Sequence, residues 1–194
     1  MLAPGTPAPD FRVFSTDGTR VSLADFRGQR LVLFFFPRAF GPGATVEARR
    51  FRDSAVALAA SGVALLGVSP DTHSRQCDFA RAERLPFPLV ADAEGALCRA
   101  YGARSPLWPL VHSARRLAYV LDEAGRVEAA FGAGLSAARQ VDAVLAFLAR
   151  PRPAQPSRLR ALRSVAPLDA GARLLRRAAD EARPRPALRL LRPL

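Results

Sequence analysis

The chain has 194 residues, of which 49% are hydrophobic and 24% charged, and this globular composition excludes a wholly disordered chain. Its formal net charge is +12 and all 29 basic residues are arginines, which excludes chemistry that needs a lysine, such as a Schiff base or a phosphate-binding P-loop. Two cysteines are too few for a disulfide framework.

Nothing in the sequence indicates export or membrane insertion. The first ten residues are rich in proline and lack the basic start and apolar core of a secretory signal. The longest apolar run is far shorter than the roughly 18 residues that a membrane span needs. Because Cys77 and Cys98 do not require an oxidising compartment, we expect a cytoplasmic protein.

Strand-like and helical runs alternate along residues 1–150. An Asp-Gly turn separates runs at 11–14 and 21–23 and predicts a hairpin, and the apolar run at 30–36 predicts a strand buried on both faces. Further strands are expected at 63–68, 87–90, 117–121 and 126–131, and helices at 42–60, 72–84, 94–101 and 136–149. This order predicts an α/β fold whose mixed, mostly parallel sheet is flanked by helices on both faces.

Residues 151–194 differ in composition from the rest of the chain. They hold 11 of the 29 arginines and begin with Pro151, Pro153 and Pro156, which stop a helix and favour a stiff connector. We expect a domain over 1–150 and a basic extension rich in Arg, Pro and Leu over 151–194, partly helical or disordered. Its basic segments suit an anionic partner, either nucleic acid or an anionic membrane.

Other interpretations of this extension stay open. It has no aromatic residue, so it lacks both a base-stacking platform and an interfacial anchor. A solvated tail is the simpler interpretation. A third is that its leucines dock on a partner or on the domain itself.

Several motifs, in unbroken order, carry a family resemblance. They are GTPAPDF at 5–11, LADFRG at 23–28, FFFP at 34–37, PGATVE at 42–47, VSPD at 68–71, LPFPLVAD at 85–92, YG at 101–102 and RLAYVLD at 116–122. Over about 5–150 the chain resembles the peroxiredoxins of the bacterioferritin-comigratory type. The resemblance implies a thioredoxin-like fold, reduction of hydroperoxides with thiols drawn from thioredoxin, and dimerisation as in many peroxiredoxins.

The family's active-site pattern is incomplete in this chain. Peroxiredoxins of this type carry Pro-x-x-x-Thr-x-x-Cys, and here the three named positions are Pro37, Gly41 and Ala44. A methyl group is no nucleophile and glycine has no hydroxyl. Arg49 stands where some relatives have a local resolving cysteine, while Arg116 matches the family's active-site arginine.

These departures predict absent or very weak peroxidase activity and leave a binding or regulatory role. Because Gly41 and Arg49 depart together with Ala44, natural divergence is favoured over one engineered substitution. Arg116 beside the helix N-terminus at Ala44 and Thr45 would suit an anion. The alternative is a structural ion pair between Arg116 and Glu47 of that helix.

Cys77 and Cys98 are the remaining candidate redox thiols. Cys77 lies one helical turn after His73, where an imidazole can help to form a thiolate, so a thiol oxidoreductase that uses Cys77 and perhaps Cys98 is an alternative function. The simpler interpretation makes Cys77 a half-buried apolar residue and Cys98 a core residue. His73, Cys77, Cys98 and His112 lack the paired short spacing of zinc sites, so no metal and no cofactor are expected.

Overall fold

The computed structural model describes residues 1–108, 110, 112–132 and 134–151. The chain divides into two units, Met1–Pro151 and Arg152–Leu194, and the second lies outside the described residues. The predictions for the basic extension therefore stay predictions. Within the described part, no helix is long and apolar enough to cross a membrane.

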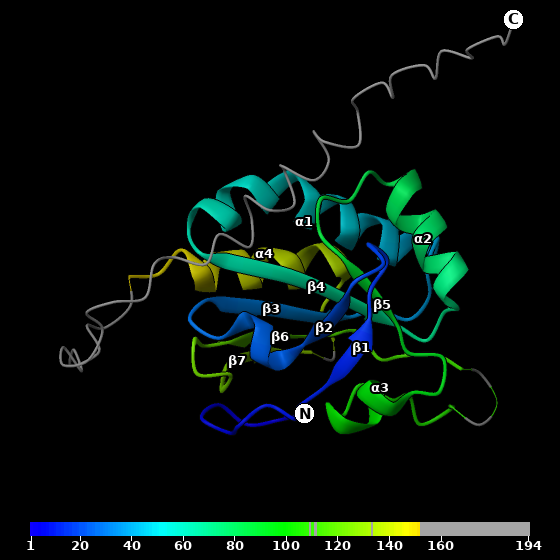
Figure 1. The fold of residues 1–194 in the computed structure, drawn as a ribbon, viewed down its shortest axis with the longest axis horizontal. Coiled ribbons are helices and arrows are strands. Elements are labelled where there is room, and N and C mark those ends of the chain that lie inside the picture. Colours follow the sequence, from blue (N-terminus) through cyan, green and yellow to red (C-terminus); the bar gives the residue numbers. More distant parts are fainter. Residues whose placement is uncertain (109, 111, 133, 152–194) are drawn as a thin grey trace, which may run out of the picture. The chain divides into compact units, whose positions relative to one another are not determined.

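A five-stranded sheet forms the centre of the first unit (Figure 1). Its strand order is β5-β4-β3-β6-β7, with bounds β3 Arg30–Phe35, β4 Val63–Ser69, β5 Leu89–Ala91, β6 Leu117–Leu121 and β7 Val127–Phe131. The β3–β4 and β4–β5 pairs are parallel, whereas β3–β6 and β6–β7 are antiparallel. The sheet is mixed, as predicted, and the hairpin expected around residues 122–125 joins β6 to β7. The expected parallel majority is wrong, because β6 also pairs antiparallel with β3, which makes two pairs of each kind.

Helices cover both faces of this sheet, as predicted. They are α1 Pro42–Ala60, α2 His73–Ala82, α3 Ala96–Ala100 and α4 Ala137–Leu148. Figure 1 shows α1 and α4 together on one face and α3 on the other. A separate hairpin of β1 Arg12–Phe14 and β2 Arg20–Ser22 pairs antiparallel, and Ser15 forms a bridge to Val90 of β5.

Strand β3 supplies both halves of the hydrophobic core, because all six of its residues are buried. Successive side chains of a strand point to opposite faces. Phe34 therefore packs with Phe51 of α1 in one core cluster, and Leu33 packs with Leu97 and Tyr101 in the other. This two-sided burial explains the uninterrupted apolar run in the sequence.

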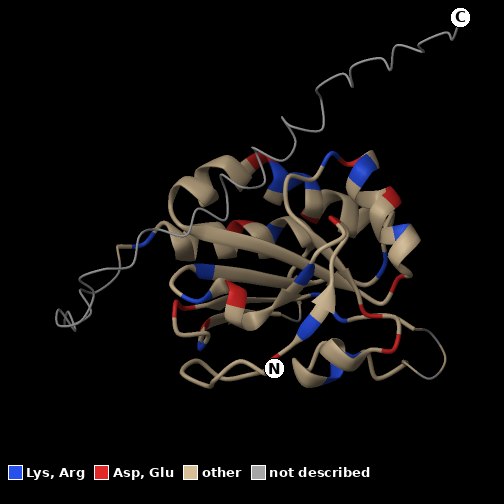
Figure 2. Ribbon diagram, in the orientation of Figure 1, with Lys and Arg blue, Asp and Glu red and all other residues tan. Residues whose placement is uncertain are grey.

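The predicted elements are all present, and their ends differ from the predicted ones by three residues at most. One local assignment was wrong, because Leu23 begins the 3-10 helix Leu23–Phe26 instead of ending a strand. Ser22 and Asp25 form a capping box there, which stabilises the start of that helix. Arginines and acidic residues are interspersed over the described elements (Figure 2), so the basic excess is not gathered on one helix or strand.

Phe51→Ala is expected to destabilise the fold by about 3–5 kcal/mol, because it leaves a cavity beside Phe34, whose ring centroid lies 4.7 Å away. Urea unfolding measures the change. Val56→Ala, on the same helix but 82% exposed, is the matched control and is expected to change the free energy of unfolding by less than about 0.5 kcal/mol. Equal effects of the two substitutions would contradict this packing.

Candidate active site

The candidate site lies at the N-terminus of α1. Gly41 is the N-cap residue with extended backbone, Pro42 follows it, and no side chain caps the helix. Ala44 is the third helical residue and is 3% exposed. Thr45 donates its backbone N–H to the Gly41 carbonyl at 2.9 Å. The first turn of α1 is thus fully formed, and it encloses a methyl group at Ala44.

Arg116 reaches this helix from the residue before β6. A side chain at position 43 would collide with its guanidinium, so Gly43 allows the close approach. The Arg116 Nε donates to Glu47 Oε2 at 3.1 Å. Of the two interpretations of Arg116, the structure confirms the pairing with Glu47.

Glu47 is a buried acid one turn beyond Ala44, with an exposed fraction of 0%. Burial raises the pKa of its carboxyl to about 8, and the attraction of Arg116 offsets only part of that rise. Its Oε1 has no hydrogen-bond partner among the described residues. Near neutral pH the carboxyl is therefore mostly protonated, and the ion pair with Arg116 forms fully only in more alkaline solution.

Arg49, which the family resemblance matches to a local resolving cysteine, forms an ion pair with Glu83. Its Nε and Nη2 donate to the two carboxylate oxygens of Glu83, at 2.7 and 3.2 Å. Glu83 is the C-cap residue of α2, so this two-point contact ties α1 to the end of α2. Arg49 thus has a structural partner.

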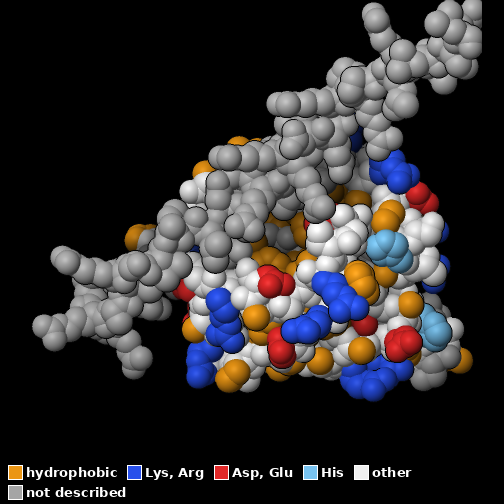
Figure 3. Space-filling model, viewed as in Figure 1, with side chains coloured by type: hydrophobic (Ala, Val, Ile, Leu, Met, Phe, Trp, Pro, Cys, Tyr) orange, Lys and Arg blue, Asp and Glu red, His pale blue; other side chains and the backbone are white. Residues whose placement is uncertain are grey.

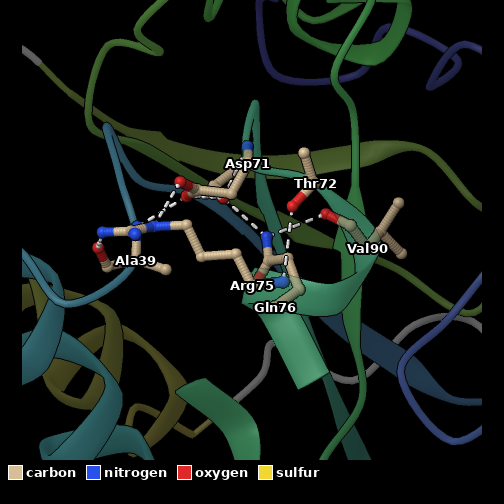
Figure 4. Close-up of polar contacts among 7 residues, drawn as sticks. Ala39, Asp71, Thr72, Arg75, Gln76 and Val90 are labelled. Carbon is tan, nitrogen blue, oxygen red and sulfur yellow. Dashed lines mark hydrogen bonds and ion pairs between the residues drawn. The ribbon is translucent and has the colours of Figure 1, made fainter. Parts of the chain in front are cut away.

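The loop between β3 and α1 is held by Asp71, which follows β4 (Figure 4). The Asp71 Oδ2 accepts hydrogen bonds from the Ala39 backbone N–H and from the Ser69 hydroxyl, both at 2.6 Å. Gln76 extends this network, because its Nε2 donates to Ser69 Oγ at 2.5 Å and to the Val90 carbonyl at 3.1 Å. The loop is therefore anchored to the ends of β4 and β5.

Arg75 closes the same network from α2. Its Nη2 donates to the Ala39 carbonyl at 3.0 Å, and its Nε lies 3.1 Å from Asp71 Oδ1 (Figure 4). Phe40, whose φ is +64°, packs between the Phe79 ring and the Arg75 guanidinium. The roles of Asp71 and Arg75 were not predicted from the sequence, although their spacing of four residues was a usable signal.

Cys77 lies beside His73, as their spacing predicts. The Cys77 Sγ is 3.4 Å from His73 Nε2 and 3.8 Å from the Thr16 carbonyl oxygen. Cys77 is half-buried and His73 is exposed, which confirms the simpler description of this pair without testing a redox role.

Cys98 lies in the core, with an exposed fraction of 0%. Its backbone N–H donates to Asp92 Oδ2 at 2.7 Å, and burial, followed by the nearby Asp92 carboxylate, raises the pKa of its thiol far above the ordinary value. A thiol in this state is a poor nucleophile near neutral pH. The surroundings of Cys98 therefore disfavour the redox role considered for it.

The four potential metal ligands do not form one site. His73 and Cys77 are together on α2, Cys98 is on α3, and His112 stacks on Trp108 with ring centroids 5.5 Å apart. Among the residues that the structure describes, no three His, Cys, Asp or Glu side chains are placed to share a metal ion.

Comparison with known proteins places this fold and site in a family. The sequence profile of the AhpC/TSA family matches residues 4–130. The chain belongs to the AhpC/TSA family. The peroxiredoxin Bcp of Escherichia coli is 35% identical over 133 residues, which cover 67% of this chain and 85% of that protein.

Solved structures of family members share the architecture. Peroxidoxin BcpB of Mycobacterium tuberculosis superposes with a TM-score of 0.71 at 30% identity, covering 76% of this chain and 97% of the other. The bacterioferritin comigratory protein of Xanthomonas campestris, which has been studied for alkyl peroxide reduction, gives 0.68 at 29% identity, covering 75% and 97%. The predicted peroxiredoxin resemblance and thioredoxin-like fold are thereby confirmed.

Glu47 is expected to make stability fall as the pH rises. The folded chain keeps the Glu47 proton to about pH 8, whereas the unfolded chain releases it near the ordinary value of 4.5, so rising pH between these values favours unfolding. The free energy of unfolding should lose up to about 1.4 kcal/mol per pH unit from this group.

Urea unfolding of the wild type and Glu47→Gln across this pH range isolates the contribution of Glu47, because glutamine does not titrate. Glu94→Gln, at an exposed position, is the matched control and should follow the wild type. A wild-type slope equal to that of Glu47→Gln would refute the assignment.

Proposed function

We propose that this protein is a peroxiredoxin-fold protein without thiol peroxidase activity, which retains a binding or regulatory role. One observation carries the proposal: the residue at the nucleophile position, Ala44, is a buried methyl group in the first turn of α1. Peroxide reduction in this family needs a thiolate there, which attacks the peroxide and becomes a sulfenic acid. No other described side chain replaces it, because Cys98 is enclosed in the core and Cys77 belongs to α2.

Two more positions support the proposal. Gly41 supplies no hydroxyl to position a peroxide, and Arg49 is engaged with Glu83 where some relatives carry a resolving thiol. The surrounding frame is nevertheless retained, since Arg116 still meets the N-terminus of α1 and Asp71 still anchors the preceding loop. The chain thus combines the family's scaffold with a degenerate active site.

The binding role has several candidate ligands and partners. Binding of an anion at Ala44, Thr45 and Arg116 is one candidate, although the anion would have to share Arg116 with Glu47. We also propose a thioredoxin-type reductant, a homodimer, a cytoplasmic location and an anionic partner for residues 151–194.

A second candidate function is thiol chemistry at Cys77. The contact between its Sγ and His73 Nε2 supports this candidate, because a neighbouring imidazole can accept the thiol proton. Cys98 gains no comparable support.

Restoring the two missing groups tests the main proposal. In an assay with hydrogen peroxide, thioredoxin, its reductase and NADPH, the native chain is expected to consume no peroxide above background. The double variant Ala44→Cys, Gly41→Thr is expected to turn over, because the thiol then lies beside Arg116 at the helix N-terminus.

Gly41→Thr alone is the control and should stay inactive, since it has the hydroxyl but no nucleophile. Turnover by the native chain would refute the proposal. An inactive but folded double variant would show that the scaffold has lost more than its nucleophile.

A further inference from the structure

A hollow beside the β1–β2 hairpin is lined in part by His73, the neighbour of Cys77. It has a volume of about 480 Å³, in the range of about 300–1,000 Å³ that holds small organic molecules. Its lining comes from three separate elements, namely the β1–β2 hairpin, the start of α2 and the end of β5. The lining residues are Val13, Phe14, Ser15, Gly18, His73 and Ala91.

Two neighbours of the Cys77 sulfur connect it to this hollow. His73, whose Nε2 is 3.4 Å from Sγ, is itself a lining residue. The Thr16 carbonyl lies 3.8 Å from Sγ, and the preceding residue, Ser15, lines the hollow. A molecule in the hollow would therefore contact the imidazole that lies against the thiol.

The wall of the hollow is held in place by the central sheet. The Thr16 backbone N–H donates to the Leu89 carbonyl at 2.9 Å, and the Leu89 N–H donates to Thr16 Oγ1 at 3.0 Å. The hairpin is thus attached to β5, and the hollow is available without a rearrangement of the backbone.

The chemical character of the hollow favours a ligand with an apolar arm. Val13, Phe14 and Ala91 provide apolar surface, and Phe14 keeps 57% of its surface exposed. Arg20 stacks over the Phe14 ring at 4.9 Å. Figure 3 shows the same mixture of arginine and hydrophobic side chains on this face of residues 1–151.

We propose that Cys77, His73 and this hollow form a thiol-exchange site that captures a small disulfide with an apolar or aromatic arm. The inference deepens the second candidate function, naming its substrate class, and it does not depend on the state of the Ala44 pocket.

The reaction needs no added oxidant or reductant. His73 accepts the Cys77 proton, and the thiolate attacks one sulfur of the bound disulfide. A new bond joins Cys77 to that sulfur while the original sulfur–sulfur bond breaks. The other half leaves as a thiolate and takes the proton back from His73. The product is a mixed disulfide on Cys77 and one free small thiol.

Dithiodipyridine is a suitable probe, because each exchange releases one coloured pyridinethione. We expect the native chain to react at a rate that saturates with probe concentration, and mass spectrometry to locate the first adduct on Cys77. Cys77→Ser should remove this reaction, and its only remaining cysteine is the enclosed Cys98.

Two further variants test the parts of the site. His73→Ala should slow exchange at saturating probe by about tenfold or more, and added imidazole should restore part of the rate, which a purely structural effect would not allow. Phe14→Ala should raise the half-saturating concentration, whereas Leu110→Ala, at another exposed hydrophobic residue, should not.

A rate that rises linearly with probe and equals that of a cysteine peptide would overturn the inference. So would a first adduct on Cys98 or an undiminished rate in folded His73→Ala. These failures are distinct from failure of the main proposal, which depends on peroxide consumption.

Discussion

The carboxyl group of Asp71 is the contact on which the arrangement of the site depends. It receives the Ala39 N–H from the loop after β3 and the Ser69 hydroxyl from the end of β4, and Arg75 completes the contact from α2. These bonds join two neighbouring parallel strands where their carboxyl ends meet. Since α1 starts just after this loop, its first turn has a defined position whichever residue occupies position 44.

The contact between Arg116 and Glu47 determines the charge at the start of α1. In a peroxiredoxin a positive charge at the start of this helix helps to hold a thiolate. Here Ala44 offers no charge, and the nearest acid to Arg116 is Glu47, which burial keeps largely protonated near neutral pH. The same burial that encloses Glu47 also excludes water from around Ala44. Near neutral pH the Arg116 guanidinium therefore keeps its positive charge beside a mostly uncharged Glu47 carboxyl.

Local patterns in the sequence predicted much of the fold. The apolar run at 30–36 predicted the doubly buried β3, and the bounds of α1 agree because Pro42 favours a first helical position. The direction of strand pairing was harder to predict, since the antiparallel β3–β6 pair depends on contacts between residues far apart in the chain. Leu23 was assigned to a strand because it follows strand-like residues, whereas the capping box of Ser22 and Asp25 starts a 3-10 helix at Leu23.

The candidate site was only partly predictable. The positions of Ala44, Gly41 and Arg116 followed from the family resemblance, and the pairing of His73 with Cys77 followed from helical spacing. Neither source reveals that Glu47 is enclosed or that Arg49 meets Glu83, because both depend on the packing of separate helices. The hollow beside His73 also arises only when the hairpin is attached to β5. Sequence patterns identify the candidate residues, but only the tertiary structure shows which of them have a hydrogen-bond or ion-pair partner.

The main proposal is that the native chain has no thiolate at the N-terminus of α1, where the family reduces peroxide. The most direct measurement treats the full chain with hydrogen peroxide, traps sulfenic acid with dimedone at successive times, and maps the adduct by mass spectrometry. We expect Cys98 to stay unmodified and Cys77, around which the described residues form no peroxide-binding pocket, to oxidise no faster than a small free thiolate. Rapid formation of a sulfenic acid at Cys77 or Cys98 would contradict it and would show that peroxide chemistry has moved to another residue.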